Sequence, residues 1–370
     1  MSTHATPAPF PASRSVDDPC FCFGVIEGFF GRAWSWIARE QWAQFLAKIG
    51  GNLYVYAPKS DGALRRHWRV PFDSQHLAAL DHCRQVYQQA GVGFGVGLTL
   101  LDVQQGLTPA DLEALRVKIY QLNQLNLDLL AILFDDMRGD FPGLAATQLD
   151  LVNRVVHSSH AKRFAVCPTY YSEDPALERV FGQRPSGYWE TLRSLDPDID
   201  LFWTGPQVCS QSYSPAHLAE VNHRLGRPVL LWDNYPVNDA QRLVTRLFLN
   251  GIGQREARLR SGCRGQLMNP MNQPLLSRIA IATMARVHQH GIQTPPPNSH
   301  AEIQAIAAPQ LAKLLIRDAK QFAESGLEGL SESERQSLIQ DYSNCQDPMA
   351  QEVVDWLQGK YAFDPACLTE

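Results

Sequence analysis

Strand-like and helix-like segments alternate eight times along this chain of 370 residues, and this alternation constrains the fold more than any other feature. A strand followed by a helix, repeated eight times, is typical of a (β/α)8 barrel. The strand candidates are residues 22–27, 52–57, 92–98, 128–134, 163–167, 200–203, 228–232 and 264–268. Amphipathic stretches long enough for an outer ring of helices lie between them, for example at 35–49, 75–90, 109–125, 146–159 and 275–289. The sequence therefore predicts an α/β fold, a (β/α)8 TIM barrel followed by a small C-terminal helical region.

Composition changes along the chain predict its domain organisation. Residues 1–19, rich in Pro, Ser, Thr and Ala, are expected to form a disordered tail, and residues 20–290 the catalytic barrel. A Pro-rich linker is expected at 291–301, because the consecutive prolines at 295–297 cannot continue a helix. The remaining residues, 302–370, form the predicted C-terminal helical region.

The C-terminal region has its own apolar pattern. Apolar residues that approximate helix faces are Leu311, Leu314, Leu315 and Phe322, followed by Val353, Trp356 and Leu357. Ser331 and Glu334 have the spacing of a capping box at a helix start. These helices are expected to pack on the barrel or on a second subunit, as in a homodimer, and the sequence leaves both open.

Charge and cysteine usage narrow the class of protein. A formal net charge of −5 and a pI near 6.1 give no support for a nucleic-acid partner. The densest basic cluster, residues 65–69, is interrupted by Trp68 and is too short for a phosphate-binding stripe. The sequence has neither a secretory signal nor a run of 18 apolar residues, so we expect no membrane association. The cysteines lack C-x2-C pairs and are expected to be reduced thiols in a cytoplasmic protein.

Two adjacent carboxylates, Asp135 and Asp136, end the apolar run 129–134. The run has the pattern of a strand buried on both faces. In a (β/α)8 barrel the carboxyl ends of the strands carry the chemistry, which favours a catalytic pair. A solvated loop or a helix N-cap would also explain two aspartates here, and the pair alone does not decide between these interpretations.

Other predicted strands also end in polar or aromatic residues. These endings are Glu27-Gly28-Phe29-Phe30-Gly31, Tyr56-Ala57-Pro58-Lys59, Cys167-Pro168-Thr169-Tyr170-Tyr171, Trp203-Thr204-Gly205-Pro206, Trp232-Asp233-Asn234 and Asn269-Pro270. Each ending has a structural explanation, because Pro and Gly turn the chain and Asn caps helices. Together they suit a sugar. Trp232 and Tyr171, with Trp203 as a further candidate, offer apolar faces for a pyranose ring, while amides, carboxylates and Lys59 can orient its hydroxyls.

These motifs, with the longer first one from Gly24 to Trp34, resemble glycoside hydrolase family 84, the O-GlcNAcase-type β-N-acetylglucosaminidases. They occur in the family's order and span residues 20 to about 290. The chain departs from the family's pattern at Tyr170, where a Glu is common, and around residues 98–100. These departures are expected to alter the groove beyond the sugar pocket.

The resemblance implies a set of site residues. Asp135 and Asp136 would be the catalytic pair, and Gly28 and Lys59 would hold the sugar. Tyr171 would contact the N-acetyl group and Trp232 would wall the acetamido pocket. The residues that would bind the acetamido group or the sugar hydroxyls are Asn234, Asp239 and Asn269.

The resemblance also implies a mechanism, in which the 2-acetamido oxygen of the substrate is itself the nucleophile. Asp135 would orient and stabilise the acetamide as an anion, and Asp136 would be the general acid and then the base. The expected substrate is a glycoside or glycoprotein that contains N-acetylglucosamine, with no metal or organic cofactor. The alternatives are a hyaluronidase-like glycan hydrolase and a non-catalytic N-acetylglucosamine-binding protein.

Overall fold

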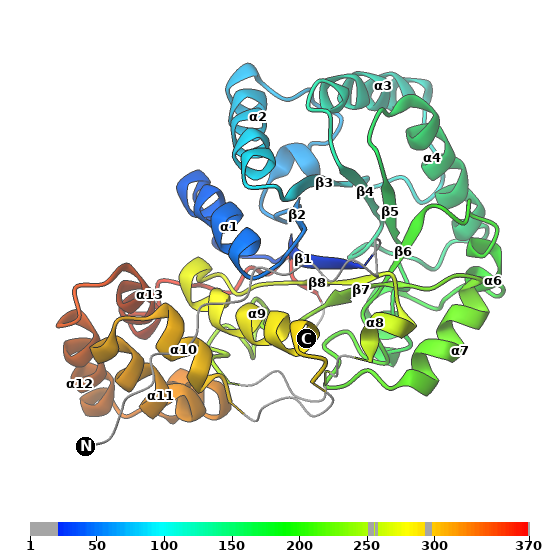
Figure 1. The fold of residues 1–370 in the computed structure, drawn as a ribbon. Coiled ribbons are helices and arrows are strands. Elements are labelled where there is room, and N and C mark those ends of the chain that lie inside the picture. The colour runs from blue at the N-terminus through cyan, green and yellow to red at the C-terminus, as the bar shows by residue number, and fades with distance from the viewer. Residues whose placement is uncertain (1–20, 251–254, 256–257, 293–297, 369–370) are drawn as a thin grey trace.

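The computed structural model describes residues 21–250, 255, 258–292 and 298–368, and they form a closed barrel with a helical region beside it (Figure 1). All neighbouring strands are parallel, and the barrel closes where β1 pairs with β8. The strands are β1 (Cys22–Glu27), β2 (Leu53–Tyr56), β3 (Gly93–Thr99), β4 (Leu129–Leu133), β5 (Phe164–Cys167), β6 (Asp200–Trp203), β7 (Leu230–Asp233) and β8 (Gly265–Met268). The predicted fold class is confirmed, because each predicted strand coincides with an observed one.

The barrel strands are short and apolar because both of their faces are covered. Every residue of β4 is buried, between the barrel interior and the helices outside. Its register is fixed on both sides, with Leu133 opposite Thr99 of β3 and opposite Cys167 of β5. This register sets the position of the two aspartates that follow β4 at the barrel mouth.

Helices surround the strands, as the amphipathic stretches predicted. They are α1 (Trp36–Lys48), α2 (Ser74–Gln89), α3 (Pro109–Asn123), α4 (Leu144–Ser158), α5 (Pro175–Phe181), α6 (Tyr188–Leu192), α7 (Pro215–Leu225), α8 (Leu259–Gly262) and α9 (Pro274–Gln289), with a 3-10 turn η1 (Gly62–Leu64). Side chains cap several of the helix starts: Ser35 accepts from the N–H of Ala38, and Thr108 and Asp111 form a capping box. These caps explain why the helices begin where the strand-to-helix loops end.

The C-terminal helices α10 (His300–Ile306), α11 (Pro309–Glu324), α12 (Glu332–Ser343) and α13 (Pro348–Leu357), with the turn η2 (Gly326–Gly329), gather at one side of the barrel (Figure 1). Their buried residues share one hydrophobic cluster with Leu276 and Ile279 of α9, so this region packs on the barrel. The predicted capping box of Ser331 and Glu334 is present. Glu352 of α13 accepts hydrogen bonds from the N–H groups of Leu275 and Leu276 at the start of α9, which joins the two parts.

Some sequence predictions fall outside what the structure tests. The predicted tail 1–19 and residues 293–297 of the predicted linker lie outside the described residues. Helix α10 begins at His300, two residues before the predicted start of the helical region at 302. The domain boundaries therefore stay predictions. Among the residues that the structure describes, none of the helices is long and apolar enough to cross a membrane.

Candidate active site

A pocket opens at the barrel mouth, and every predicted site residue lines it. These residues are Gly28, Lys59, Asp135, Asp136, Tyr171, Trp232, Asn234, Asp239 and Asn269. They lie at or just after the ends of strands β1, β2, β4, β5, β7 and β8, so only the closed barrel brings them together. An indole beside amides, carboxyls and an ammonium is the kind of lining that small-molecule sites have.

The pocket also has lining residues that were not among the predicted site residues: Phe30, Cys167, Thr204, Val208, Cys209, Val237, Ala240 and Cys367. Trp203 is not one of the lining residues. Its indole packs against Trp189, its N–H reaches His217, and the side chain is buried. Trp203 is therefore a packing residue, and the suggestion that it offers a sugar-binding face was wrong.

Asp135 and Lys59 form a buried ion pair at the centre of the pocket. Burial acts to lower the pKa of Lys59, but the charges of Asp135 and Asp136 outweigh it and raise that pKa. The ammonium therefore stays charged and holds Oδ2 of Asp135. No group within the described part of the chain bonds the other oxygen, Oδ1, although it is buried. Since buried polar atoms are almost always bonded, this oxygen is an acceptor suited to a ligand N–H.

Asp136 lies beside this pair in different surroundings. Its Oδ2 is 3.7 Å from Nζ of Lys59, and its backbone is left-handed, with φ 54°. Burial raises the pKa of the Asp136 carboxyl, and the charge of Asp135 adds to this, while Lys59 and Arg65 act against it. A carboxyl with a raised pKa next to an ionised one is the arrangement expected of a general acid.

A network of amide groups fixes the wall formed by Trp232. The indole N–H of Trp232 and Nδ2 of Asn269 both donate to Oδ1 of Asn234, each at 3.0 Å. Oδ1 of Asn269 accepts the N–H of Gly28 at 3.2 Å. The indole lies so close to Gly28 that a Cβ there would be 2.3 Å from Cζ2 of Trp232, so only glycine fits without displacing the ring.

Asp239 and Tyr171 lie on other walls of the pocket. Oδ2 of Asp239 accepts the N–H of Phe30 at 2.8 Å. Burial raises the pKa of Asp239 to about 6 against that hydrogen bond, and the charge of Asp136 contributes to the rise. Tyr171 is 5% exposed and follows β5, where its carbonyl accepts the N–H of Thr204.

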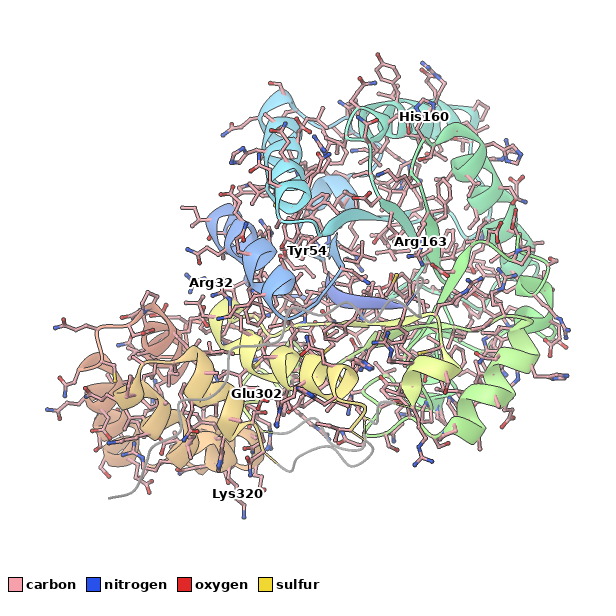
Figure 2. All side chains as sticks on the ribbon, in the orientation of Figure 1. Arg32, Tyr54, His160, Arg163, Glu302 and Lys320 are labelled. Carbon is pink, nitrogen blue, oxygen red and sulfur yellow. The ribbon has the colours of Figure 1, made fainter. Side chains whose placement is uncertain are left out.

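Two acidic residues at strand ends do not line the pocket. Glu27 is fully buried, and Arg39 of α1 binds both of its oxygens, at 2.7 and 2.8 Å. The hydroxyl of Tyr54 also donates to Glu27, on the side of β2 that faces α1 and α2 (Figure 2). Asp233 is bound in the same way by Arg255. Both carboxylates therefore anchor strand ends, and no pattern in the sequence identifies their arginine partners.

A family model described as beta-N-acetylglucosaminidase matches residues 23–317, which is most of the chain. The chain belongs to the beta-N-acetylglucosaminidase family. This confirms the resemblance to the O-GlcNAcase-type enzymes of glycoside hydrolase family 84 and makes the chain a glycoside hydrolase by family. The matched range includes the whole barrel and α10, and it extends into α11.

Curated and solved members of the beta-N-acetylglucosaminidase family agree with this assignment. The protein O-GlcNAcases of Mus musculus and Rattus norvegicus are each 29% identical over 281 residues, which is 72% of this chain. The chain spans about 30% of the length of these relatives. A mutant of the Thermobaculum terrenum O-GlcNAc hydrolase matches with a TM-score of 0.72 and 25% identity, over 92% of this chain and 75% of that one. CpGH84B, at 23% identity and a TM-score of 0.72 over 92% of this chain and 66% of its own, shares the fold.

Proposed function

We propose that this protein is an exo-acting, retaining β-N-acetylglucosaminidase that removes terminal β-linked N-acetylglucosamine from a glycoside or glycoprotein. The observation that carries the proposal is the pair at the end of β4. Asp135 has one oxygen held by Lys59 and one buried oxygen with no partner within the described residues, and Asp136 beside it has a raised pKa. The two carboxyls are thus suited to two different tasks.

In the proposed mechanism the acetamido oxygen of the sugar attacks the anomeric carbon as the bond to the aglycone oxygen breaks. Oδ1 of Asp135 accepts the acetamide N–H and stabilises the positive charge that develops on the nitrogen. Asp136 gives its proton to the departing oxygen, which leaves a cyclic oxazoline. Asp136 then takes a proton from the water that opens this ring, so the configuration is retained. General acid–base assistance of this kind is worth roughly 100- to 10,000-fold.

The other lining residues support binding of one sugar. Trp232, held by Asn234, offers a flat apolar wall beside polar groups, which is a composition that suits a pyranose with an acetamido group. The side chains of Tyr171, Asp239 and Asn269 are proposed to bind the N-acetyl group and the hydroxyls, and Gly28 lets the indole approach.

Hydrolysis of a fluorogenic β-N-acetylglucosaminide tests the proposal directly. We expect release of the fluorophore by the parent protein and almost none by the Asp135→Asn variant, because this activated leaving group departs without a proton but still needs the acetamide to attack. Binding of N-acetylglucosamine without any release would instead indicate a non-catalytic binding protein. Products of internal cleavage from hyaluronan would indicate the hyaluronidase-like alternative.

A cytoplasmic location and a homodimer formed through the C-terminal helices are also proposals, and they rest on the sequence. Light scattering after size exclusion tests the dimer, and fractionation of the source cells tests the location.

A further inference from the structure

The chain does not end among the C-terminal helices but returns to the barrel after α13 (Figure 1). Arg32, in the loop after β1, lies at the junction between the barrel and these helices (Figure 2). Its guanidinium is 5.3 Å from the ring centroid of Tyr361 and 3.6 Å from the carboxylate of Asp355. The contact with Asp355 joins this loop to α13, and the contact with Tyr361 places the start of residues 361–367, here called the C-terminal segment, against the same loop.

The C-terminal segment reaches the sugar pocket. Cys367 lines the same pocket as Asp135 and Asp136, and it is 8% exposed. It belongs to a small apolar cluster with Phe30 and Ala240, which also line the pocket. Phe363, Ala366 and Leu243 pack at the edge of this cluster.

A turn fixes the position of Cys367. Its N–H donates to the carbonyl of Asp364 at 2.9 Å, and the N–H of Ala366 donates to the Asp364 carboxylate at 3.0 Å. Together with the apolar cluster, these bonds give the end of the segment a defined shape. The segment is therefore a wall of the pocket rather than a strand of chain lying across it.

Barrel topology places this wall opposite the catalytic pair. The pair follows β4, and in the closed order β1 to β8 the strand across from β4 is β8, whose neighbours are β7 and β1. Phe30 follows β1 and Ala240 follows β7, so the cluster with Cys367 lies on that far side. The bond from the N–H of Phe30 to Asp239 ties the same wall to a residue proposed to bind the sugar.

The orientation of the sugar follows from the proposed function, on which this inference rests. The anomeric carbon must lie near Asp136, and C4 is the ring atom opposite the anomeric carbon in a pyranose. We propose that the C-terminal segment closes the far end of the sugar pocket, and that Cys367 is a specificity-determining residue that excludes a substituent on the C4 hydroxyl. The helical region would then contribute directly to the choice of terminal sugars.

Enlarging Cys367 tests the wall. Cys367→Trp would fill space that the sugar needs, and Leu368→Trp is a matched control because Leu368 is the next residue, is 49% exposed and does not line the pocket. We expect Cys367→Trp to lower kcat/KM on a fluorogenic N-acetylglucosaminide by about 10-fold or more, mainly through KM, as expected for a pocket that loses room. Leu368→Trp should stay within about twofold of the parent, as for most surface substitutions.

Ligand protection tests the same wall in the unaltered protein, in case the tryptophan variant fails to fold. Saturating N-acetylglucosamine should slow alkylation of Cys367 by iodoacetamide, mapped by mass spectrometry, and should leave alkylation of Cys345 in the helical region unchanged. Unchanged alkylation of Cys367 would overturn the proposal. So would equal activity of the Cys367→Trp and Leu368→Trp variants in a parent that is active.

The order of product release tests the exclusion at C4. With the para-nitrophenyl glycoside of a β-1,4-linked N-acetylglucosamine disaccharide, the parent should release the terminal sugar first. Direct release of the whole disaccharide would contradict the wall but leave the proposed hydrolase intact. A parent that cleaves neither this compound nor the monosaccharide glycoside would contradict the proposed function itself.

Discussion

Asp135 and Asp136 are neighbours in the chain, yet their surroundings differ. Lys59 bonds one oxygen of Asp135, and burial together with the charge of Asp135 raises the pKa of Asp136. Lys59 thus pairs with one carboxyl, while burial favours the protonated form of the other, which is how a fold separates two roles between like groups.

Replacing each aspartate should separate these roles. Asp136→Asn should lower kcat by roughly 100- to 10,000-fold on substrates with poor leaving groups, since the departing oxygen loses its proton donor. The loss should be much smaller on activated aryl glycosides, which need no proton. Steady-state rates on an alkyl and an aryl N-acetylglucosaminide measure the difference.

Asp135→Asn should damage both substrate classes alike, because oxazoline formation accompanies the departure of either aglycone. Asp140→Asn is the control variant. Among the contacts of the described residues, the Asp140 side chain pairs with Arg138 alone.

For Asp136→Asn, similar losses on both substrate classes would contradict the role of Asp136 as the acid.

The pH dependence of kcat tests how the charge of Arg65 affects the pKa of Asp136. Arg65 is buried, its guanidinium lies near the Asp136 carbonyl at 3.5 Å, and its charge lowers the pKa of Asp136. Because the acid must be protonated, kcat falls as pH rises through this pKa. Arg65→Gln removes a positive charge, raises the pKa and should shift the basic limb of the kcat profile to higher pH. The exposed neighbour Arg66, changed to Gln, should not move that limb; a shift toward lower pH in Arg65→Gln would refute the argument.

Which residue at each strand end faces the pocket was the part of the site that the sequence alone predicted least well. Glu27 and Gly28 are adjacent, as are Asp233 and Asn234, yet only the second of each pair lines the pocket. The first of each pair is bound by an arginine that is distant in the sequence. The resemblance pointed to Gly28 and Asn234, which line the pocket, whereas residue type alone did not distinguish the two members of each pair.

The strands and the long helices were predictable from periodicity, because their apolar patterns are regular and their caps are local. The short elements α5, α6 and α8 were not, since a helix of one or two turns leaves little periodic signal. The sequence also did not predict the hydrogen-bonded contact between α13 and α9. This contact depends on Glu352, whose partners at residues 275 and 276 are far away in the sequence.

Glu352 makes this contact sensitive to pH. Burial raises the pKa of the Glu352 carboxyl from 4.5 to about 8, although the hydrogen bonds that it accepts from two backbone N–H groups act to lower that pKa. Between pH 4.5 and 8 the unfolded chain releases the Glu352 proton, whereas the folded protein keeps it. The contribution of this carboxyl to the free energy of unfolding is therefore largest below about pH 4.5 and is lost as the pH rises toward 8. Glu352→Gln should reduce the loss of unfolding free energy between these pH values by up to a few kcal/mol, since each pKa unit corresponds to about 1.36 kcal/mol.

Urea unfolding at about pH 5 and about pH 8 measures this decline. The exposed Glu328, changed to Gln, is the control and should keep the decline of the parent. An identical decline in Glu352→Gln and in the parent would show that this carboxyl does not titrate between those pH values.

At the scale of the whole molecule, the barrel collects groups that the chain order keeps far apart. Gly28 and Asn269 are separated by almost the full length of the barrel sequence, yet closure of β1 on β8 brings them into contact. The barrel and the position of Asp135 and Asp136 at its mouth were therefore predictable once eight strand–helix units had been recognised. The return of the C-terminal segment to the pocket was not, because it depends on single contacts such as Arg32 with Tyr361.

In the proposed reaction the acetamido group of the substrate is the nucleophile. Fluorination of the N-acetyl group withdraws electrons from its oxygen and weakens that nucleophile, while it leaves the aglycone unchanged. The direct test is kcat/KM of the parent enzyme on aryl glycosides with N-acetyl, N-fluoroacetyl, N-difluoroacetyl and N-trifluoroacetyl groups. We predict a steep fall with each added fluorine; a rate that does not change across the series would contradict the claim.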